Sequence, residues 1–122
     1  MTKHILLVDD SEVIRIATRH FLESQPGLAV CGEAVDGIEA LEKARELRPD
    51  LIIVDLSMPR MNGLDTARAL RVMMRNVPII LFTWYADAVQ AGDAAAAGIS
   101  AVVSKTNPAA LQKHINKLVA AA

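Results

Sequence analysis

Short apolar runs alternate along this chain with longer stretches that mix apolar and polar residues. Five runs lack a polar face of period two, and they span residues 5–8, 28–31, 51–54, 79–82 and 101–103. Runs of this kind are typical of strands that are buried on both faces of a parallel sheet. The pattern therefore predicts five short strands that form one buried sheet.

The stretches between these runs have apolar positions at helical spacing, and most of them begin with a helix-start signal. Ser11, Asp36 and Asn62 can each cap a helix, and Asn107-Pro108 pairs a capping residue with a proline at the first helical position. The predicted apolar stripes of these four helices are Val13, Ile14, Ala17 and Phe21; Ala40, Leu41, Ala44 and Leu47; Ala67, Leu70 and Met74; and Leu111, His114, Ile115, Leu118 and Val119.

A further helix is predicted from about residue 86 to residue 97, and its apolar stripe is the weakest of the five. It contains Gly92, which lowers helix stability, and Gly98 supplies a stop signal after its alanine-rich end. We expect this segment to be an element of low stability that can move.

Five strands that alternate with five helices predict a doubly wound α/β domain. Right-handed crossovers restrict its topology to a few strand orders. Hydrophobic residues make up 52% of the 122 residues, which is enough for one sizeable core. Residues 1–122 are therefore expected to form a single domain.

Reactive or charged residues follow four of the five predicted strands. Asp9 and Asp10 follow the first strand, Asp55 the third, Thr83 the fourth, and Lys105 comes shortly after the fifth. The carboxyl ends of parallel strands share one edge of the sheet, which is where such folds place their ligand sites. Each residue alone is an ordinary loop or surface residue, but their joint placement predicts a site.

This set of groups favours a hard metal ion and phosphoryl chemistry. Three neighbouring carboxylates need a cation, and oxygen ligands favour Mg²⁺, Mn²⁺ or Ca²⁺ over zinc. Asp55 ends a central strand alone, so it is the predicted nucleophile toward phosphorus, whereas Asp9 and Asp10 are better placed as metal ligands. Lys105 and Thr83 could stabilise the phosphoryl oxygens.

Charge and composition argue against several partners. The formal net charge is −1 and no basic stretch suggests nucleic-acid binding. No apolar run reaches the roughly 18 residues of a membrane span, and the N-terminus lacks the pattern of a signal peptide. Cys31 is the single cysteine, which rules out an intrachain disulfide and fits a reducing cytosol. We expect a cytoplasmic protein that binds neither membrane nor nucleic acid directly.

Over nearly its whole length the chain resembles the receiver domain of bacterial two-component response regulators. The matching segments are residues 5–10, residues 55–59 continuing to Asn62-Gly63, Thr83 and Lys105. The resemblance implies a flavodoxin-like fold with strand order 2-1-3-4-5. It also implies a signalling switch, not an enzyme, because a receiver domain catalyses only its own phosphotransfer and autodephosphorylation.

The resemblance also assigns roles to the site residues. Asp55 would accept a phosphoryl group from a sensor histidine kinase or a phosphotransfer protein, Thr83 would sense it, and Lys105 would pair with it. Mg²⁺, or Mn²⁺ in its place, would be held by Asp9, Asp10, Asp55 and the backbone carbonyl of Ser57. Pro59 and Gly63 would shape the loop beneath the site. The signal would pass to a downstream target protein, or to an output domain of a longer regulator, through a surface centred on the fourth helix, fifth strand and fifth helix.

Three positions depart from the family's pattern. Val102 replaces the usual aromatic residue, Thr106 replaces the usual proline after the lysine, and Trp84, followed by Tyr85, replaces a small residue after the threonine. Val102 and Trp84 would alter the usual coupling between threonine and aromatic residue. The Trp84 ring could hinder water or small donors at the phosphoryl site, or it could turn away and pack on the fourth helix.

Three other functions remain open on the sequence. The main alternative is a receiver-like interaction module that is not phosphorylated in the cell. A metal-dependent phosphohydrolase with an aspartyl nucleophile would normally need a cap or further acid-base groups. A nucleotide-binding domain is least supported, because no Gly-rich phosphate loop follows the first strand.

Overall fold

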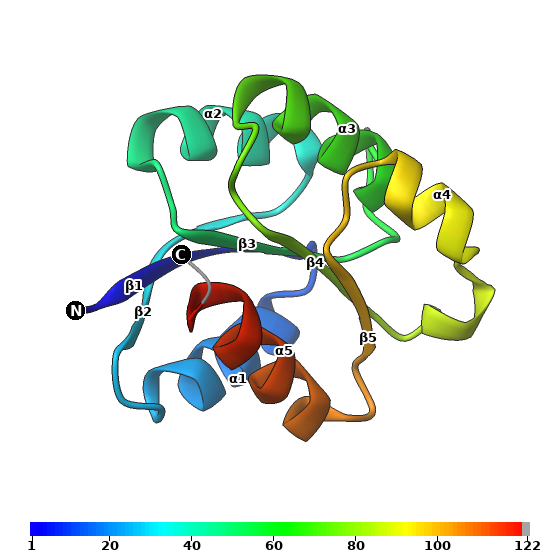
Figure 1. Cartoon of the computed structure of the whole chain (residues 1–122). Helices are drawn as coiled ribbons and strands as arrows, with labels where there is room; N and C mark the ends of the chain where they lie inside the picture. The colour runs from blue at the N-terminus through cyan, green and yellow to red at the C-terminus, as the bar shows by residue number, and fades with distance from the viewer. Residues whose placement is uncertain (121–122) are drawn as a thin grey trace.

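In the computed structural model, which describes residues 1–120, five parallel strands form one sheet with helices on both faces (Figure 1). The strands are β1 (Lys3–Val8), β2 (Leu28–Ala34), β3 (Leu51–Val54), β4 (Ile79–Thr83) and β5 (Ala101–Ser104). Their order in the sheet is β2-β1-β3-β4-β5. This order confirms the predicted flavodoxin-like topology.

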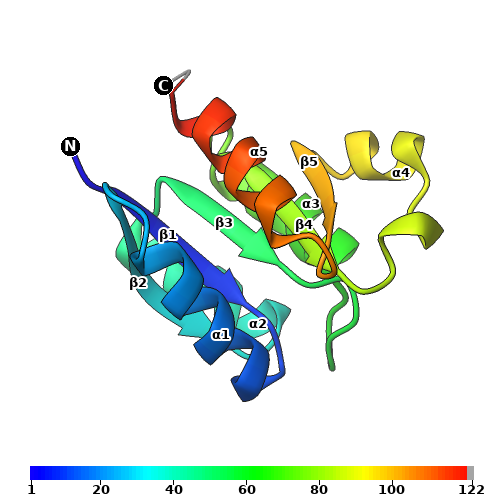
Figure 2. The ribbon, with the colours of Figure 1, turned by 90° about the horizontal axis from the view of Figure 1, so that it is seen from below.

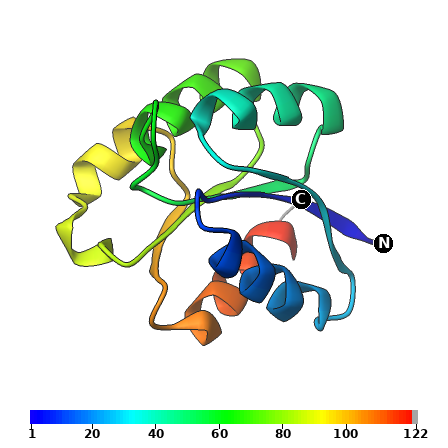
Figure 3. The same ribbon diagram turned by 180° about the vertical axis from the view of Figure 1, so that it is seen from behind.

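The helices form two layers. They are α1 (Glu12–Glu23), α2 (Gly37–Leu47), α3 (Gly63–Met73), α4 (Ala91–Ala96) and α5 (Pro108–Ala120), with a 3-10 turn at Ala86–Ala88. Helices α1 and α5 cover one face of the sheet, and α2 and α3 cover the other, with α4 beyond β5 (Figures 1, 2 and 3). None of the helices in the described part of the chain is long and apolar enough to span a bilayer.

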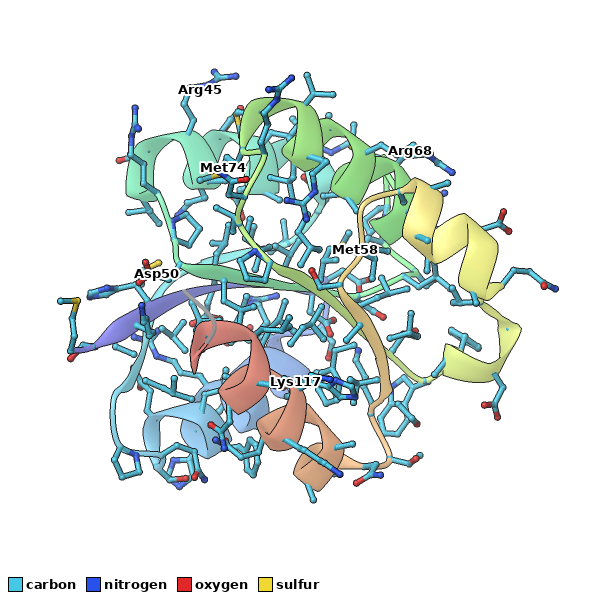
Figure 4. All side chains as sticks on the ribbon, in the orientation of Figure 1. Arg45, Asp50, Met58, Arg68, Met74 and Lys117 are labelled. Carbon is cyan, nitrogen blue, oxygen red and sulfur yellow. The ribbon has the colours of Figure 1, made fainter. Side chains whose placement is uncertain are left out.

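Each central strand contributes alternate side chains to the apolar clusters on the two faces of the sheet, which explains why the strands show no polar face. Along β1, Leu6 and Val8 pack in the cluster beneath α2 and α3, whereas Ile5 and Leu7 pack in the cluster beneath α1 and α5. Met58, labelled in Figure 4, packs from the loop after β3 against the first of these clusters. The sheet is therefore buried between two apolar clusters, one on each face.

All four predicted capping side chains make the expected hydrogen bonds. Ser11 Oγ accepts from the backbone N–H of Ile14 at 3.3 Å, and Asn107 Oδ1 accepts from that of Ala110 at 3.2 Å. The carboxylate of Asp36 and the amide oxygen of Asn62 each accept from the N–H three residues on, at 2.9 Å. The sequence signals for the starts of α1, α2, α3 and α5 are thereby confirmed.

The predicted fourth helix is wrong in its extent. Residues 86–97 form a 3-10 turn, an extended residue at Val89 (φ −89°, ψ 120°) and then the short helix α4. Neither the turn nor α4 has a side-chain cap, and Ala94 is the only buried residue within these two elements. The stop at Gly98 is confirmed, since its φ of +80° is the left-handed conformation that suits glycine.

The predicted apolar stripe of α1 is only partly buried. Val13 is 74% exposed and Ala17 is also exposed, whereas Ile14 and Phe21 are half-buried. The fully buried residue of the helix is Leu22, which the predicted stripe did not include. Part of the reason is packing: an open cavity of about 150 Å³ lies between α1 and α5 beside Ile14, Ala17 and Phe21, so this side of the helix is only partly covered.

Candidate functional site

The predicted site residues meet at one edge of the sheet, as parallel strand ends require. Asp9 follows β1, Asp55 follows β3, Thr83 ends β4, and Lys105 follows β5. These four residues are buried, whereas Asp10 is exposed. The site therefore has a buried polar floor with one acidic side chain at its solvent side.

The three carboxylates are close enough to share one cation. One oxygen from each of Asp9, Asp10 and Asp55 lies within 4.8 Å of the other two. Like charges at this separation repel unless a cation lies between them, and an all-oxygen donor set suits a hard divalent ion. Since Asp10 faces solvent, an ion could enter from that side and keep water ligands, as Mg²⁺ usually does.

Lys105 supplies the positive charge that the chain itself brings to this cluster. Its Nζ lies 2.6 Å from Asp9 Oδ2 and 3.3 Å from Asp55 Oδ2, and its side chain is 3% exposed. Its backbone N–H donates to the carbonyl of Thr83 at 3.0 Å, which ties the start of the β5–α5 loop to the end of β4. The ammonium is thus fixed over the two buried carboxylates.

Burial raises the pKa of Asp55 above its ordinary value. The ammonium of Lys105 opposes this rise by attraction, and the nearby charge of Asp9 adds to it. The backbone N–H of Leu56 also donates to Asp55 Oδ1 at 2.8 Å. Ionisation of Asp55 is therefore unfavourable in this buried position, and a bound cation would favour it.

We expect Asp55→Asn to raise the melting temperature of the metal-free protein at pH 7. A folded-state pKa above the unfolded value makes a contribution to stability that is complete below the unfolded pKa and lost as pH rises through the folded pKa. At pH 7 ionised Asp55 therefore weakens the fold, and asparagine removes that charge. Thermal unfolding in EDTA should show that the melting temperature of Asp55→Asn exceeds that of the wild type by less at pH 4 than at pH 7. A difference that grows as the pH falls would contradict this.

Asp9 is anchored at both its backbone and its carboxylate. Oδ1 accepts from the N–H of Ser11 at 2.9 Å, and the backbone N–H donates to the carbonyl of Ala34 at 3.0 Å. The carbonyl accepts from a guanidinium nitrogen of Arg15 at 2.7 Å, and Arg15 also pairs with Glu33 at 2.9 Å. Sequence reasoning missed Arg15, because an arginine on a helix usually signals only a solvated face.

The predicted sensing and modulating residues occupy different environments. Thr83 is fully buried, and its Oγ1 accepts from the N–H of Tyr85 at 3.2 Å. Trp84 and Tyr85 are 55% and 57% exposed. Val102, at the position of the usual aromatic residue, is half-buried and packs against the cluster beneath α2 and α3.

Trp84 lies beside the site. Its ring centroid is 6.0 Å from Lys105 Nζ, which is the outer limit of a cation–π contact. The ring also lines the cavity between α1 and α5, together with Phe82 and Leu111. Of the two orientations that the sequence left open, the ring therefore takes one beside the lysine.

Ser57 lies in the exposed loop that joins β3 to α3. The loop is closed at its base by a hydrogen bond of 2.8 Å from the N–H of Gly63 to the carbonyl of Leu56. Gly63 packs so tightly there that a Cβ would stand 2.9 Å from the carbonyl carbon of Asp55. The glycine is thus required at the point where the loop returns to the site, while the role of the Ser57 carbonyl stays a prediction.

Known proteins resemble this chain in sequence and structure. A protein-glutamate methylesterase/protein-glutamine glutaminase of Nocardioides sp. is 44% identical over 103 residues, which are 83% of this chain and 28% of that protein. The response regulator VraR of Staphylococcus saprophyticus is 34% identical over 86% of this chain and 50% of its own length. This chain thus spans about half or less of these relatives.

Solved structures agree. A LuxR-family two-component response regulator from Aurantimonas sp. superposes with a TM-score of 0.91 at 35% identity, covering 99% of this chain and 87% of that one. The response regulator TrrA of Thermotoga maritima, solved in complex with Mg²⁺ and BeF, superposes with a TM-score of 0.86 at 32% identity, covering 96% and 99%. The family model of the response regulator receiver domain matches residues 5–116. With its strand order and its acidic strand-end cluster, this chain belongs to the response regulator receiver domain family.

Proposed function

We propose that this domain is a phosphorylation switch that accepts a phosphoryl group on Asp55 in a Mg²⁺-dependent reaction. The donor is a sensor histidine kinase or a phosphotransfer protein. The observation that carries the proposal is the cluster of three carboxylate oxygens within 4.8 Å, with Lys105 Nζ 2.6 and 3.3 Å from two of those carboxylates. The superposition on a response regulator solved with Mg²⁺ and BeF supports it.

The chain's own residues would carry most of the chemistry. A carboxylate oxygen of Asp55 attacks phosphorus, and the bond from phosphorus to the donor atom breaks, with its electron pair leaving on the donor. Lys105 then shifts its hydrogen bond from the carboxylates to a phosphoryl oxygen, and the Thr83 hydroxyl donates to another. Mg²⁺, held by Asp9, Asp10, Asp55 and the carbonyl of Ser57, would neutralise charge on the transferring group.

The switch would act through the elements that join the site to α4. Phosphorylation adds up to about two negative charges at Asp55. The Thr83 hydroxyl accepts a hydrogen bond from the N–H of Tyr85, so an inward movement of Thr83 would also move Tyr85. The uncapped turn at Ala86–Ala88 and the short α4 follow Tyr85 directly and would move with it. The surface formed by α4, β5 and α5 would then change for a downstream target or an output domain. We place this signalling in the cytoplasm.

Intact mass of the protein after incubation with acetyl phosphate, with and without Mg²⁺, tests the proposal. One phosphate increment that appears only with Mg²⁺ is the expected result. No increment with a range of donors and kinases would favour the interaction module that is not phosphorylated. Steady release of phosphate from an ester substrate would favour the phosphohydrolase.

Removing the Trp84 ring is expected to shorten the lifetime of the phosphorylated state. The ring stands beside Lys105 and is large enough to block one approach of water to the phosphoryl group. For Trp84→Ala we expect dephosphorylation to be several-fold faster, which corresponds to a decrease of about 1 kcal/mol in its activation free energy. Decay of the phosphate increment after donor removal measures it, with Val72→Ala as the control, because Val72 is an exposed apolar residue on α3. Unchanged rates of phosphorylation and decay would rule out this role.

A further inference from the structure

The loop after Asp55 has a strained turn at its tip. Arg60 has φ +66°, and the N–H of Met61 donates to the carbonyl of Pro59 at 2.7 Å, so residues 59–61 form a γ-turn with Arg60 at its centre. A γ-turn with positive φ at its central residue is rare and strained. Arg48, the other described non-glycine residue with positive φ, caps the end of α2, where this conformation is common.

An ion pair with Asp36 holds this turn. The Nε and one terminal nitrogen of Arg60 donate to Asp36 Oδ2 at 2.9 and 2.5 Å. The Asp36 side chain is 5% exposed, and its other oxygen caps α2 by accepting from the N–H of Glu39 at 2.9 Å. That backbone hydrogen bond and the guanidinium of Arg60 lower the pKa of Asp36. The carboxylate is therefore ionised and fixed, and it offers Arg60 a rigid partner.

The same loop is fixed at two further points. At its base, Gly63 donates to the carbonyl of Leu56 at 2.8 Å. Near its tip, Met61 packs on the start of α2, where a Cβ on Gly37 would stand 2.8 Å from the Met61 Cβ. Ser57 lies between this base and this tip, so the direction of its carbonyl depends on both.

We propose that the Asp36–Arg60 pair is a latch that holds the strained turn and thereby positions the Ser57 carbonyl toward the Asp9–Asp10–Asp55 cluster. The hydrogen bonds of Asp36 and Arg60 go to each other and to the start of α2, and none goes to the cluster, so both residues are positioning residues. Through the loop they set the affinity of the site for a divalent cation. The inference rests on the proposed function, because it assumes that this cluster binds Mg²⁺.

Four variants separate the pair from the strain and from the helix cap. Asp36→Asn keeps a good capping residue but loses the charge. Arg60→Ala removes the pair and leaves a side chain in the strained conformation, whereas Arg60→Gly removes the pair and relieves the strain. Arg68→Ala is the matched control. It breaks an exposed ion pair of 2.8 Å between Arg68 and Asp65, both on α3, and Arg68 points away from the sheet (Figure 4).

The dissociation constant for Mg²⁺, measured by titration calorimetry alongside the melting temperature, tests the latch. We expect Asp36→Asn and Arg60→Ala each to weaken binding about tenfold, as loss of an outer partner of a metal site does. The double variant should be no weaker than the weaker single variant, because both changes remove one interaction. Arg60→Gly should recover part of the loss, and Arg68→Ala should bind like the wild type.

The outcomes that overturn the latch differ from those that overturn the proposed function. Wild-type affinity in both Asp36→Asn and Arg60→Ala overturns the latch alone, even if both lower the melting temperature. Additive losses in the double variant, or an Arg60→Gly that binds no better than Arg60→Ala, also overturn it. No Mg²⁺ binding by the wild-type protein overturns both proposals.

Discussion

Replacing Lys105 with methionine is expected to tighten Mg²⁺ binding and, at the same time, to slow phosphorylation of Asp55 by on the order of 10²-fold. The ammonium lies 2.6 and 3.3 Å from two of the carboxylates that would bind the ion, so it would compete with the ion for them. During transfer the same ammonium would stabilise charge on the phosphoryl oxygens. One substitution should therefore move two measured quantities in opposite directions.

Titration calorimetry with Mg²⁺ and the rate of phosphate incorporation from acetyl phosphate measure these two effects. Methionine suits the site because the lysine side chain is 3% exposed and its stem is apolar. Lys113→Met is the control, because Lys113 is an exposed lysine on α5. If the affinity for Mg²⁺ and the phosphorylation rate both fell, or if phosphorylation kept its wild-type rate, the role assigned to Lys105 would be wrong.

Replacing Gly63 with alanine is expected to destabilise the fold by about 2–3 kcal/mol. A Cβ at this position would stand 2.9 Å from the carbonyl carbon of Asp55 and 2.9 Å from the Cα of Leu56. Both obstacles are backbone atoms, so the clash cannot be relieved by turning a side chain. The loop that begins at Asp55 would have to shift, which should also weaken Mg²⁺ binding.

Gly92→Ala is a control with the opposite sign. Gly92 lies within α4, and a Cβ there would have no neighbouring atom within 4 Å. Alanine should therefore stabilise α4 by about 0.5–1 kcal/mol through backbone entropy alone. Urea unfolding of both variants measures the two effects, and a Gly63→Ala protein as stable as the wild type would contradict the packing argument.

The sequence was sufficient to predict the sheet and the residues at its edge. Strands buried on both faces leave a period-free apolar signature, and the residue after each strand must lie at the shared edge. This is why Asp9, Asp55, Thr83 and Lys105 were found together from spacing alone. Capping side chains were equally predictable, because a cap depends on three or four consecutive residues.

Features that depend on distant partners were not predictable in the same way. The pairs of Arg15 with Glu33 and of Arg60 with Asp36 join residues far apart in the sequence, and many other pairings of similar charges were possible. The apolar face of α1 had the right period, but Ala17 faces an open cavity beside α5 and stays exposed, a feature that depends on how two distant helices pack. The predicted helix over residues 86–97 is interrupted at Val89, because a weak stripe without a cap could not sustain it.

The acceptor residue is tested most directly by intact mass of the wild type, Asp55→Asn and Asp65→Asn after incubation with acetyl phosphate and Mg²⁺. Asp65 is an exposed aspartate on α3, so its variant controls for the loss of a carboxylate elsewhere. We predict a single phosphate increment in the wild type and in Asp65→Asn, and none in Asp55→Asn. An increment that persists in Asp55→Asn, or one that is absent from the wild type, would contradict the assignment of Asp55 as the phosphoryl acceptor.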